Sequence, residues 1–404
     1  MTPFNFLLFL LFLLILVELI FQFSFRLLKK NCPWIITPSD LDPEIDSNGL
    51  SRFLEHGWDK ELGWARKPNT CGNEVGLNGI PTKYHIDENG ARHCPGTENL
   101  PIGALLFGDS YAFSRQVNDD ETWAYLLSIN LGQKVQNFGV GNYGIDQALM
   151  LYERKKNNFS APVVIMAVVP ETISRILSQW KHFSEYGNTF GFKPRFQLEN
   201  NKLNFLDNPI QTPDDFYRIK DLLPELINKD WFYKNKFNKD LLRIPYVISI
   251  FKNKFHNLRL LFAAIIDKFS SNKSHAFAYI MKRNIKISSQ LYQQPFAQDL
   301  LTAICKKFSE SVRRDNSIPI IVYIPQMFDL YSSKNKPSYY APIAKKLNTI
   351  AQFIDVTPTF LQDKSSIPLY INDKYGGHLT SYGNQLVADL IAKTLRPLLT
   401  NDKS

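Results

Sequence analysis

The strongest hydrophobic pattern in the chain lies at its N-terminus. Residues 3–25 are nearly all Leu, Phe, Ile and Val, and Glu18 is the single charged side chain among them. About 20 such residues span the hydrocarbon core of a bilayer. We therefore expect a transmembrane anchor over residues 1–30, with the lipid bilayer as its partner. No small-residue cleavage site follows, so we do not expect a cleaved signal peptide.

Beyond residue 100, short apolar runs alternate with stretches of helical periodicity. The expected strands cover residues 102–107, 135–138, 162–169, 318–324 and 353–356. The expected helices cover residues 123–131, 145–156 and 386–398. Strands that alternate with helices in this way predict parallel pairing and a doubly wound α/β sheet.

The pattern divides the rest of the chain into an arm, a core and an insertion. Residues 31–100 are short alternating pieces broken by Gly, Pro and Asn, which predict an extended or β-hairpin arm packed beside the core. Arg92 in this arm either binds a carboxylate or lies at the surface, and we expect the surface. Residues 101–174 and 316–400 carry the sheet. Residues 175–315 are expected to form a mostly helical, basic insertion. Its amphipathic stretch 246–262 fits either a helix on a bilayer or one packed on the core.

The first predicted strand ends at Gly108-Asp109-Ser110. Ligands of open α/β sheets bind outside the carboxyl ends of the strands, so Ser110 is a candidate nucleophile and Asp109 a residue that orders its loop. A hydroxyl needs a base to become reactive. His378, which follows two glycines near the other end of the chain, is the candidate base. A second glycine-rich strand end covers residues 135–144.

Three blocks appear in a fixed order: Gly-Asp-Ser, then Asn-x-Gly-x-Gly-Asn, then Gly-His-Leu-Thr-x-x-Gly-Asn. This order resembles the SGNH/GDSL hydrolase superfamily of esterases and acyltransferases, over about residues 100–170 and 317–398. The resemblance implies a flavodoxin-like three-layer α/β/α sandwich with Ser110 as the catalytic serine. It also implies an oxyanion hole made from the Ser110 N–H and the second block, for which Gly139, Gly141 and Asn142 are the candidates.

The oxyanion hole departs from the family pattern at two places. Asn142 stands where the second block has glycine, and Pro170 stands where the third block has asparagine. Proline has neither an N–H nor a side-chain donor, and loss of one oxyanion donor costs about 10²–10³ in rate. We expect Asn188 or Thr172 to replace the missing donor.

The acid of the last block is also displaced. The residue three before His378 is Tyr375, and the nearest acid is Asp373, five before it. A triad acid orients the imidazole. Asp373 is therefore the third candidate catalytic residue, and a Ser–His dyad is the alternative.

The composition of the chain is that of a folded globular protein with a basic surface. Of the 404 residues, 44% are hydrophobic, and the formal net charge is +9. A basic surface of this kind is either simply solvated or attracted to an anionic membrane or polysaccharide. No compact run of Lys and Arg with interleaved aromatic residues stands out, so no nucleic-acid partner is expected. The chain lacks metal-ligand spacings and phosphate-binding loops, so no metal or cofactor is expected.

Two features disagree about which side of the membrane holds the core. Arg26, Lys29 and Lys30 follow the apolar segment, which places the core in the cytoplasm by the positive-inside rule. Cys71 and Cys94 could form a disulfide, which needs an oxidising compartment. Membrane-tethered members of the superfamily often act on envelope glycans, so we expect an extracytoplasmic core.

The function expected from these features is that of a membrane-anchored serine hydrolase or acyltransferase. It would cleave or transfer acyl ester groups, with an O-acylated surface glycan as a possible substrate. The alternative is a catalytically inactive SGNH domain that binds glycans or assembles complexes.

Overall fold

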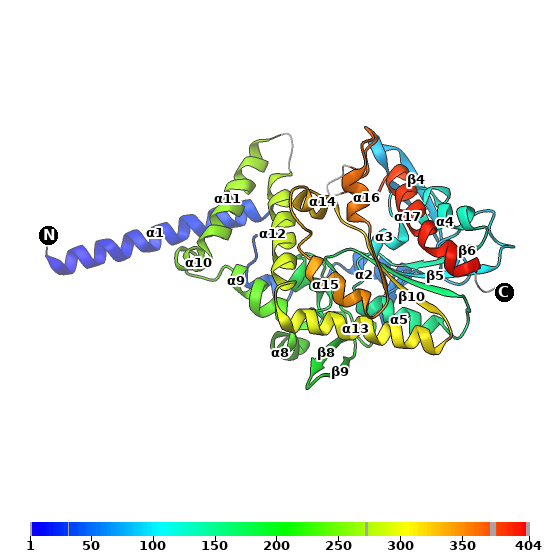
Figure 1. The fold of residues 1–404 in the computed structure, drawn as a ribbon. Helices are drawn as coiled ribbons and strands as arrows, with labels where there is room; N and C mark the ends of the chain where they lie inside the picture. The colour runs from blue at the N-terminus through cyan, green and yellow to red at the C-terminus, as the bar shows by residue number, and fades with distance from the viewer. Residues whose placement is uncertain (1, 31, 271–273, 372–376, 401–404) are drawn as a thin grey trace. The chain divides into compact units, whose positions relative to one another are not determined.

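The computed structural model describes residues 2–30, 32–270, 274–371 and 377–400 (Figure 1). The chain forms two compact units. Unit 1 comprises Met1–Leu50, Ser178–Phe192 and Thr212–Arg283, and unit 2 comprises Ser51–Leu177, Lys193–Gln211 and Asn284–Ser404. Within the segment 175–315, residues 193–211 and 284–315 therefore belong to unit 2, the unit that contains the main sheet.

The main sheet of unit 2 has five parallel strands. They are β5 (Ile102–Gly108), β6 (Lys134–Gly139), β7 (Val163–Val168), β10 (Ile318–Tyr323) and β11 (Gln352–Asp355). Their spatial order is β11-β10-β7-β5-β6, which is the flavodoxin-like order 2-1-3-4-5 when the five strands are numbered along the chain. The predicted doubly wound α/β fold is confirmed. Its switch point, where ligands bind in such sheets, lies between β5 and β7.

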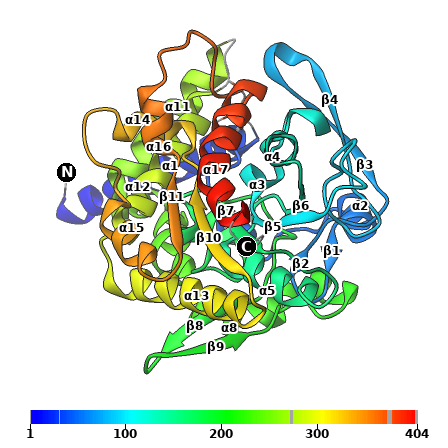
Figure 2. The same ribbon diagram turned by 45° about the vertical axis from the view of Figure 1, so that its right-hand side comes forward.

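Helices cover both faces of this sheet (Figures 1 and 2). One face carries α4 (Trp123–Leu131) and α17 (Ser381–Thr400), and the other carries α5 (Ile145–Lys155) and α13 (Pro295–Arg314). The five strands and the helices α4, α5 and α17 agree with the segments predicted from the hydrophobic pattern, whereas α13 lies in the segment that was expected to be an insertion. The strands are apolar on both faces because neither face meets water.

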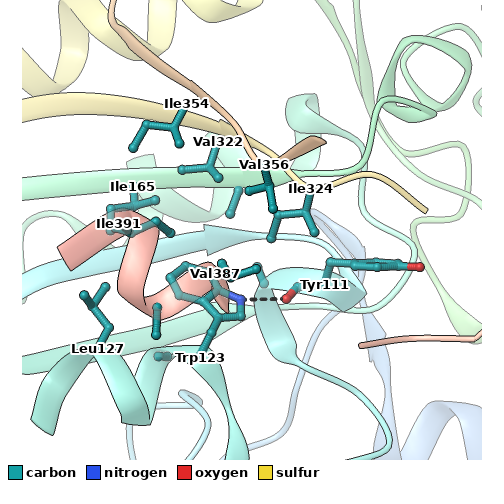
Figure 3. Close-up of a cluster of buried hydrophobic side chains, with 14 of the residues drawn as sticks. Tyr111, Trp123, Leu127, Ile165, Val322, Ile324, Ile354, Val356, Val387 and Ile391 are labelled. Carbon is teal, nitrogen blue, oxygen red and sulfur yellow. Dashed lines mark hydrogen bonds between the residues drawn. The ribbon is translucent and has the colours of Figure 1, made fainter. Parts of the chain in front are cut away.

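Figure 3 shows the core between the sheet and the helices α4 and α17. Leu127 and Ile391 from the two helices belong to the same buried cluster as Ile165 and Val322 from the strands. Trp123 is fully buried there, and its indole N–H donates to the Tyr111 carbonyl at 2.8 Å. This bond ties the core to the residue that follows Ser110.

The arm contains two small antiparallel ribbons. They are β1 (Trp58–Asp59) with β2 (Gly63–Trp64), and β3 (Cys71–Val75) with β4 (Pro81–His85). The Cys71–Cys94 disulfide is not formed, which corrects that interpretation. Cys71 is exposed, whereas the buried Cys94 sulfur lies 3.6 Å from the Ser128 hydroxyl.

Unit 2 also contains the second half of α12 (His275–Leu291). Its other regular elements are short. They are α3 (Ser110–Phe113), α6 (Thr172–Arg175), β8 (Arg195–Glu199), β9 (Lys202–Leu206), α14 (Met327–Ser333), α15 (Ala341–Asn348), α16 (Thr357–Gln362), and the 3₁₀ turns Leu77–Gly79 and Asp119–Glu121. The helix α2 (Ser47–His56) connects the two units in sequence.

Unit 1 is almost entirely helical. Its elements are α1 (Pro3–Lys29), the 3₁₀ turns Pro38–Asp40 and Pro213–Arg218, α7 (Lys181–Ser184), α8 (Ile219–Lys229), the π-turn Tyr233–Phe237, α9 (Asn238–Asp240), α10 (Tyr246–Lys252), α11 (Lys254–Phe269) and the first half of α12 (His275–Leu291). The helix α1 is long enough to cross a membrane, and an 18-residue window of it has a mean hydropathy of 2.8, a property that membrane spans and signal sequences share.

Candidate functional site

Ser110 is the first residue of α3, and Asp109 alone separates it from the end of β5 at Gly108. The last residue of the strand, residue 108, must be glycine, because a Cβ at this position would lie 1.8 Å from the Ala167 carbonyl oxygen of β7. Asp109 caps α3 by accepting the Tyr111 N–H at 2.9 Å. The serine is thus held, largely buried, at the switch point of the sheet.

The Asp109 carboxylate orders the serine loop, as expected from the sequence. Its second oxygen accepts the Val169 N–H at 2.9 Å and an Arg175 guanidinium N–H at 3.1 Å. Burial raises the pKa of Asp109, and the positive charge of Arg175 opposes that rise. Because both oxygens hold loop residues, Asp109 has a positioning role.

Arg175, which the sequence analysis missed, connects three loops of the site. Besides Asp109, its guanidinium donates to the Tyr143 carbonyl at 2.9 Å and to the Glu171 carboxylate at 3.0 Å. The serine loop, the glycine-rich loop after β6 and the segment after β7 are therefore joined by one buried cation. The i,i+4 spacing of Glu171 and Arg175 was its only sequence signal.

His378 is buried, and its imidazole is held by Gln116. The distance from His378 Nδ1 to Gln116 Oε1 is 2.9 Å, and the His378 backbone N–H lies 3.3 Å from the same oxygen. The Gln116 amide nitrogen donates to the Val75 carbonyl at 2.9 Å, so its oxygen is the atom that faces His378. Since an amide oxygen only accepts, Nδ1 carries the proton and Nε2 keeps its lone pair.

Gln116 is itself fixed by the arm. Its backbone has a positive φ of 68°, and its N–H donates to the Glu74 carboxylate at 2.6 Å. The other Glu74 oxygen accepts from Arg115 Nε at 2.7 Å. The strand β3, which carries Glu74, thereby sets the position of the residue that orients His378.

Arg92 clamps the same loop, which corrects its predicted place at the surface. Its side chain is buried and donates to the carbonyls of Phe113 (2.8 Å), Ser114 (2.5 Å) and Val117 (2.6 Å). It also pairs with Asp119 at 3.0 Å. Arginine can bind so many acceptors because it has five N–H donors. Here three of the acceptors are backbone carbonyls of one tight loop.

Tyr111 brings the serine loop and the histidine loop together. Its ring centroid lies 5.0 Å from that of His378, and its hydroxyl donates to the Gly377 carbonyl at 2.9 Å. Burial lowers the pKa of His378 to about 3, and the positive charges of Arg115 and Arg175 add to this effect. The imidazole is therefore neutral at physiological pH and able to accept a proton.

Asp373 and Tyr375 lie outside the described residues, so the position of the candidate acid is not part of the site described above. Within the described part of the chain, Gln116 is the side chain hydrogen-bonded to His378 Nδ1.

The candidate oxyanion donors have different surroundings. The Gly139 N–H donates to the Asn137 side chain at 2.9 Å, and a Cβ at residue 139 would lie 2.3 Å from the Phe113 nitrogen, so packing requires glycine here. Its role in the oxyanion hole stays a prediction. Gly141 and Asn142 are the central residues of a turn closed by the Tyr143 N–H and the Val140 carbonyl. Asn142 has a φ of 66° and is exposed. The amides of this turn remain candidates.

The two expected substitutes for the third-block asparagine both make local bonds. The Thr172 hydroxyl accepts the Ile145 N–H at 2.8 Å and so positions α5. Asn188 belongs to unit 1, where its side-chain amide donates to the Glu185 carbonyl at 2.8 Å. Its predicted role in the oxyanion hole stays a prediction.

A pocket of about 480 Å³ lies beside Gln116. One wall comes from the arm and another from the segment that leads into α17. Its apolar lining residues are Leu77, Ile80, Val117, Ile367 and Ile371. Thr380, two residues after His378, also lines it. The pocket therefore offers an apolar volume close to the candidate base.

The comparisons with known proteins add a distant structural likeness. No family model matches the chain, and no curated protein matches it in sequence. A solved structure described as a "putative lipolytic protein of G-D-S-L family from Desulfitobacterium hafniense DCB-2" is similar with a TM-score of 0.32 and 12% identity. The match covers 72% of this chain and 98% of that one.

Proposed function

We propose that this protein is a membrane-anchored serine hydrolase or acyltransferase of the SGNH type that acts on acyl esters. The observation that carries the proposal is the hydrogen bond from His378 Nδ1 to Gln116 Oε1. It leaves His378 Nε2 as a proton acceptor on a loop joined to the serine loop through Tyr111. A nucleophile and an oriented base are the minimum for covalent acyl transfer.

In the proposed reaction, Ser110 Oγ forms a bond to the ester carbonyl carbon while its proton passes to His378 Nε2. The carbonyl oxygen becomes an oxyanion, which the N–H of Ser110 and the amides of the Gly141–Asn142 turn would stabilise. The intermediate collapses, and the alcohol leaves with the proton from His378. Water or a sugar hydroxyl then resolves the acyl-enzyme, so hydrolysis and transfer share all earlier steps.

The pocket beside Gln116 supports an ester with an apolar part. Its aliphatic lining would favour an acyl chain or another hydrophobic group over a charged one. An O-acylated surface glycan is the proposed natural substrate. The anchor α1 would keep the enzyme near the membrane, where such a glycan is found. The extracytoplasmic placement of the core rests on the resemblance to membrane-tethered relatives, because the Cys71–Cys94 disulfide is not formed.

A second candidate function is binding without catalysis. The segment after β7 carries Pro170 and Glu171 where the family pattern has an asparagine donor, and the Glu171 carboxylate is paired with Arg175. An SGNH domain with an incomplete oxyanion hole could serve as a glycan-binding or assembly protein.

Labelling with a fluorophosphonate probe separates the two functions. We expect the detergent-solubilised full chain to be labelled and the Ser110→Ala variant to stay unlabelled. Ser114→Ala is the matched control, because this serine lies four residues further on and outside the proposed mechanism. Folded protein that resists the probe would favour the binding function.

A further inference from the structure

The apolar helix α1 contains one acid, and this acid is bonded to another helix of unit 1. The two Glu18 carboxylate oxygens accept the N–H groups of Tyr246 (2.8 Å) and Val247 (3.1 Å), the first residues of α10. Phe25 of α1 and Tyr246 also pack edge to face, with ring centroids 5.1 Å apart. The start of α10 is therefore fixed at a definite level along α1.

The length of α1 shows where that level lies in a bilayer. The helix before Glu18 begins at Pro3 and is 15 residues long, or about 22 Å at 1.5 Å per residue. The hydrocarbon core of a bilayer is about 30 Å thick, which needs about 20 residues. A bilayer that α1 spans must therefore extend past Glu18, to the level at which α10 begins.

An exposed apolar stripe runs along α11 (Lys254–Phe269) and includes one residue of α10. Its members on α11 follow one another at spacings of three and four, which places them on one face of that helix. Phe251 comes from α10, which ends before the non-helical residue Asn253. The side chains of the stripe are between 44% and 81% exposed. They are Phe251, Phe255, Leu258, Phe262, Ile265 and Phe269. Monomeric soluble proteins rarely expose a contiguous apolar surface of this kind.

The opposite face of α11 packs on α1. Leu260 and Ala264 belong to the same buried cluster as Phe25, so α11 cannot turn its apolar stripe inward without leaving that cluster. Exposed basic side chains lie next to the stripe: Lys252, Lys254, Arg259 and Lys268. An apolar face bordered by Lys and Arg is typical of helices that lie in the interface of an anionic membrane.

We infer that α10 and α11 lie in the membrane interface beside α1, with the stripe Phe251–Phe269 buried among lipid acyl chains. The inference rests on the membrane anchor of the proposed function, since the Glu18 bonds set the depth of α10. Anionic lipid is the proposed occupant because α10 and α11 contact the apolar helix α1 and the stripe has a basic border. In this arrangement the Glu18 carboxylate is satisfied by backbone N–H groups where water is scarce.

Site-directed spin labelling of the full chain tests this arrangement in nanodiscs of phosphatidylcholine and phosphatidylglycerol. The background variant is Cys71→Ser, because Cys71 is the exposed one of the four cysteines. A nitroxide at Leu258→Cys or Phe262→Cys probes the stripe. Leu11→Cys in α1 is the lipid control, and Glu225→Cys, exposed on α8 of the same unit, is the aqueous control.

We expect the labels at 258 and 262 to collide more often with oxygen than with a water-soluble nickel chelate, as at 11, and the label at 225 to show the reverse. Aqueous behaviour at 258 and 262, together with lipid behaviour at 11, would overturn this inference and leave the anchor intact. Aqueous behaviour at 11 would overturn both. Spin–spin coupling at 258, with low accessibility to both reagents, would instead assign the stripe to a second copy of the chain.

Discussion

Gln116 Oε1 lies 2.9 Å from His378 Nδ1, in the place that a carboxylate oxygen takes in a Ser-His-Asp triad. An amide oxygen selects the same imidazole tautomer as a carboxylate, but it brings no negative charge to stabilise an imidazolium. The low pKa of His378 is consistent with such a neutral partner, because burial and two nearby arginines act on the imidazole. Cysteine proteases of the papain type pair their histidine with an amide in a comparable way.

Replacement of Gln116 should therefore impair catalysis without unfolding the protein. We expect Gln116→Ala to lower kcat for a short ester by about 10²-fold, the lower end of the range for general acid–base catalysis. Asp373→Asn is the matched control and should stay within a few-fold of wild type, because Gln116 already holds Nδ1. A steep loss in Asp373→Asn with near-normal activity in Gln116→Ala would make Asp373 the orienting acid.

The activity should persist in mildly acidic solution. Burial lowers the pKa of His378 to about 3, so the neutral form that accepts the serine proton predominates at all higher pH values. The pH profile of kcat/KM should be flat from about pH 8 down to about pH 5. An acidic limb near pH 6.5, the ordinary pKa of histidine, would contradict the buried, amide-bonded His378.

The same histidine should make the stability depend on pH. Its pKa is about 6.5 in the unfolded chain and about 3 in the folded protein, so below pH 6.5 the unfolded state binds a proton that the folded state does not. Stability should therefore fall by about 1.4 kcal/mol per pH unit from this residue as the pH drops from 6.5 toward 3. Urea unfolding at pH 7 and pH 5 measures the loss of stability. In His378→Gln the slope of stability with pH should correspond to about one proton fewer. An unchanged slope would exclude His378 as its source.

Removal of Arg175 should destabilise unit 2. Arg175→Met would leave the fully buried Asp109 carboxylate without its cation, and breaking a buried pair from one side costs about 3–5 kcal/mol. Arg218→Met is the control, because its pair with Asp221 is exposed and worth at most about 1 kcal/mol. Equal urea midpoints for the two variants would show that the three loops around Ser110 do not depend on Arg175.

The hydrophobic pattern by itself determined the elements of the core. The predicted helix 123–131 coincides with α4, and the five predicted strands agree with β5, β6, β7, β10 and β11 to within one or two residues. These elements are readable because each buried strand or amphipathic helix repeats its apolar positions locally. The loop positions of Ser110 and His378 were readable for the same reason, since each lies where such a pattern stops.

Only the tertiary structure decided what surrounds these two residues. Gln116 and His378 are 262 positions apart in the chain, and their bond depends on Glu74 and Arg92 of the arm, which hold the loop after α3. A glutamine in a polar loop carries no periodic signal, and a buried arginine looks like a surface one until its carbonyl partners are known. Side-chain pairing between loops is set by how the elements pack, so the local pattern of the sequence does not reveal it.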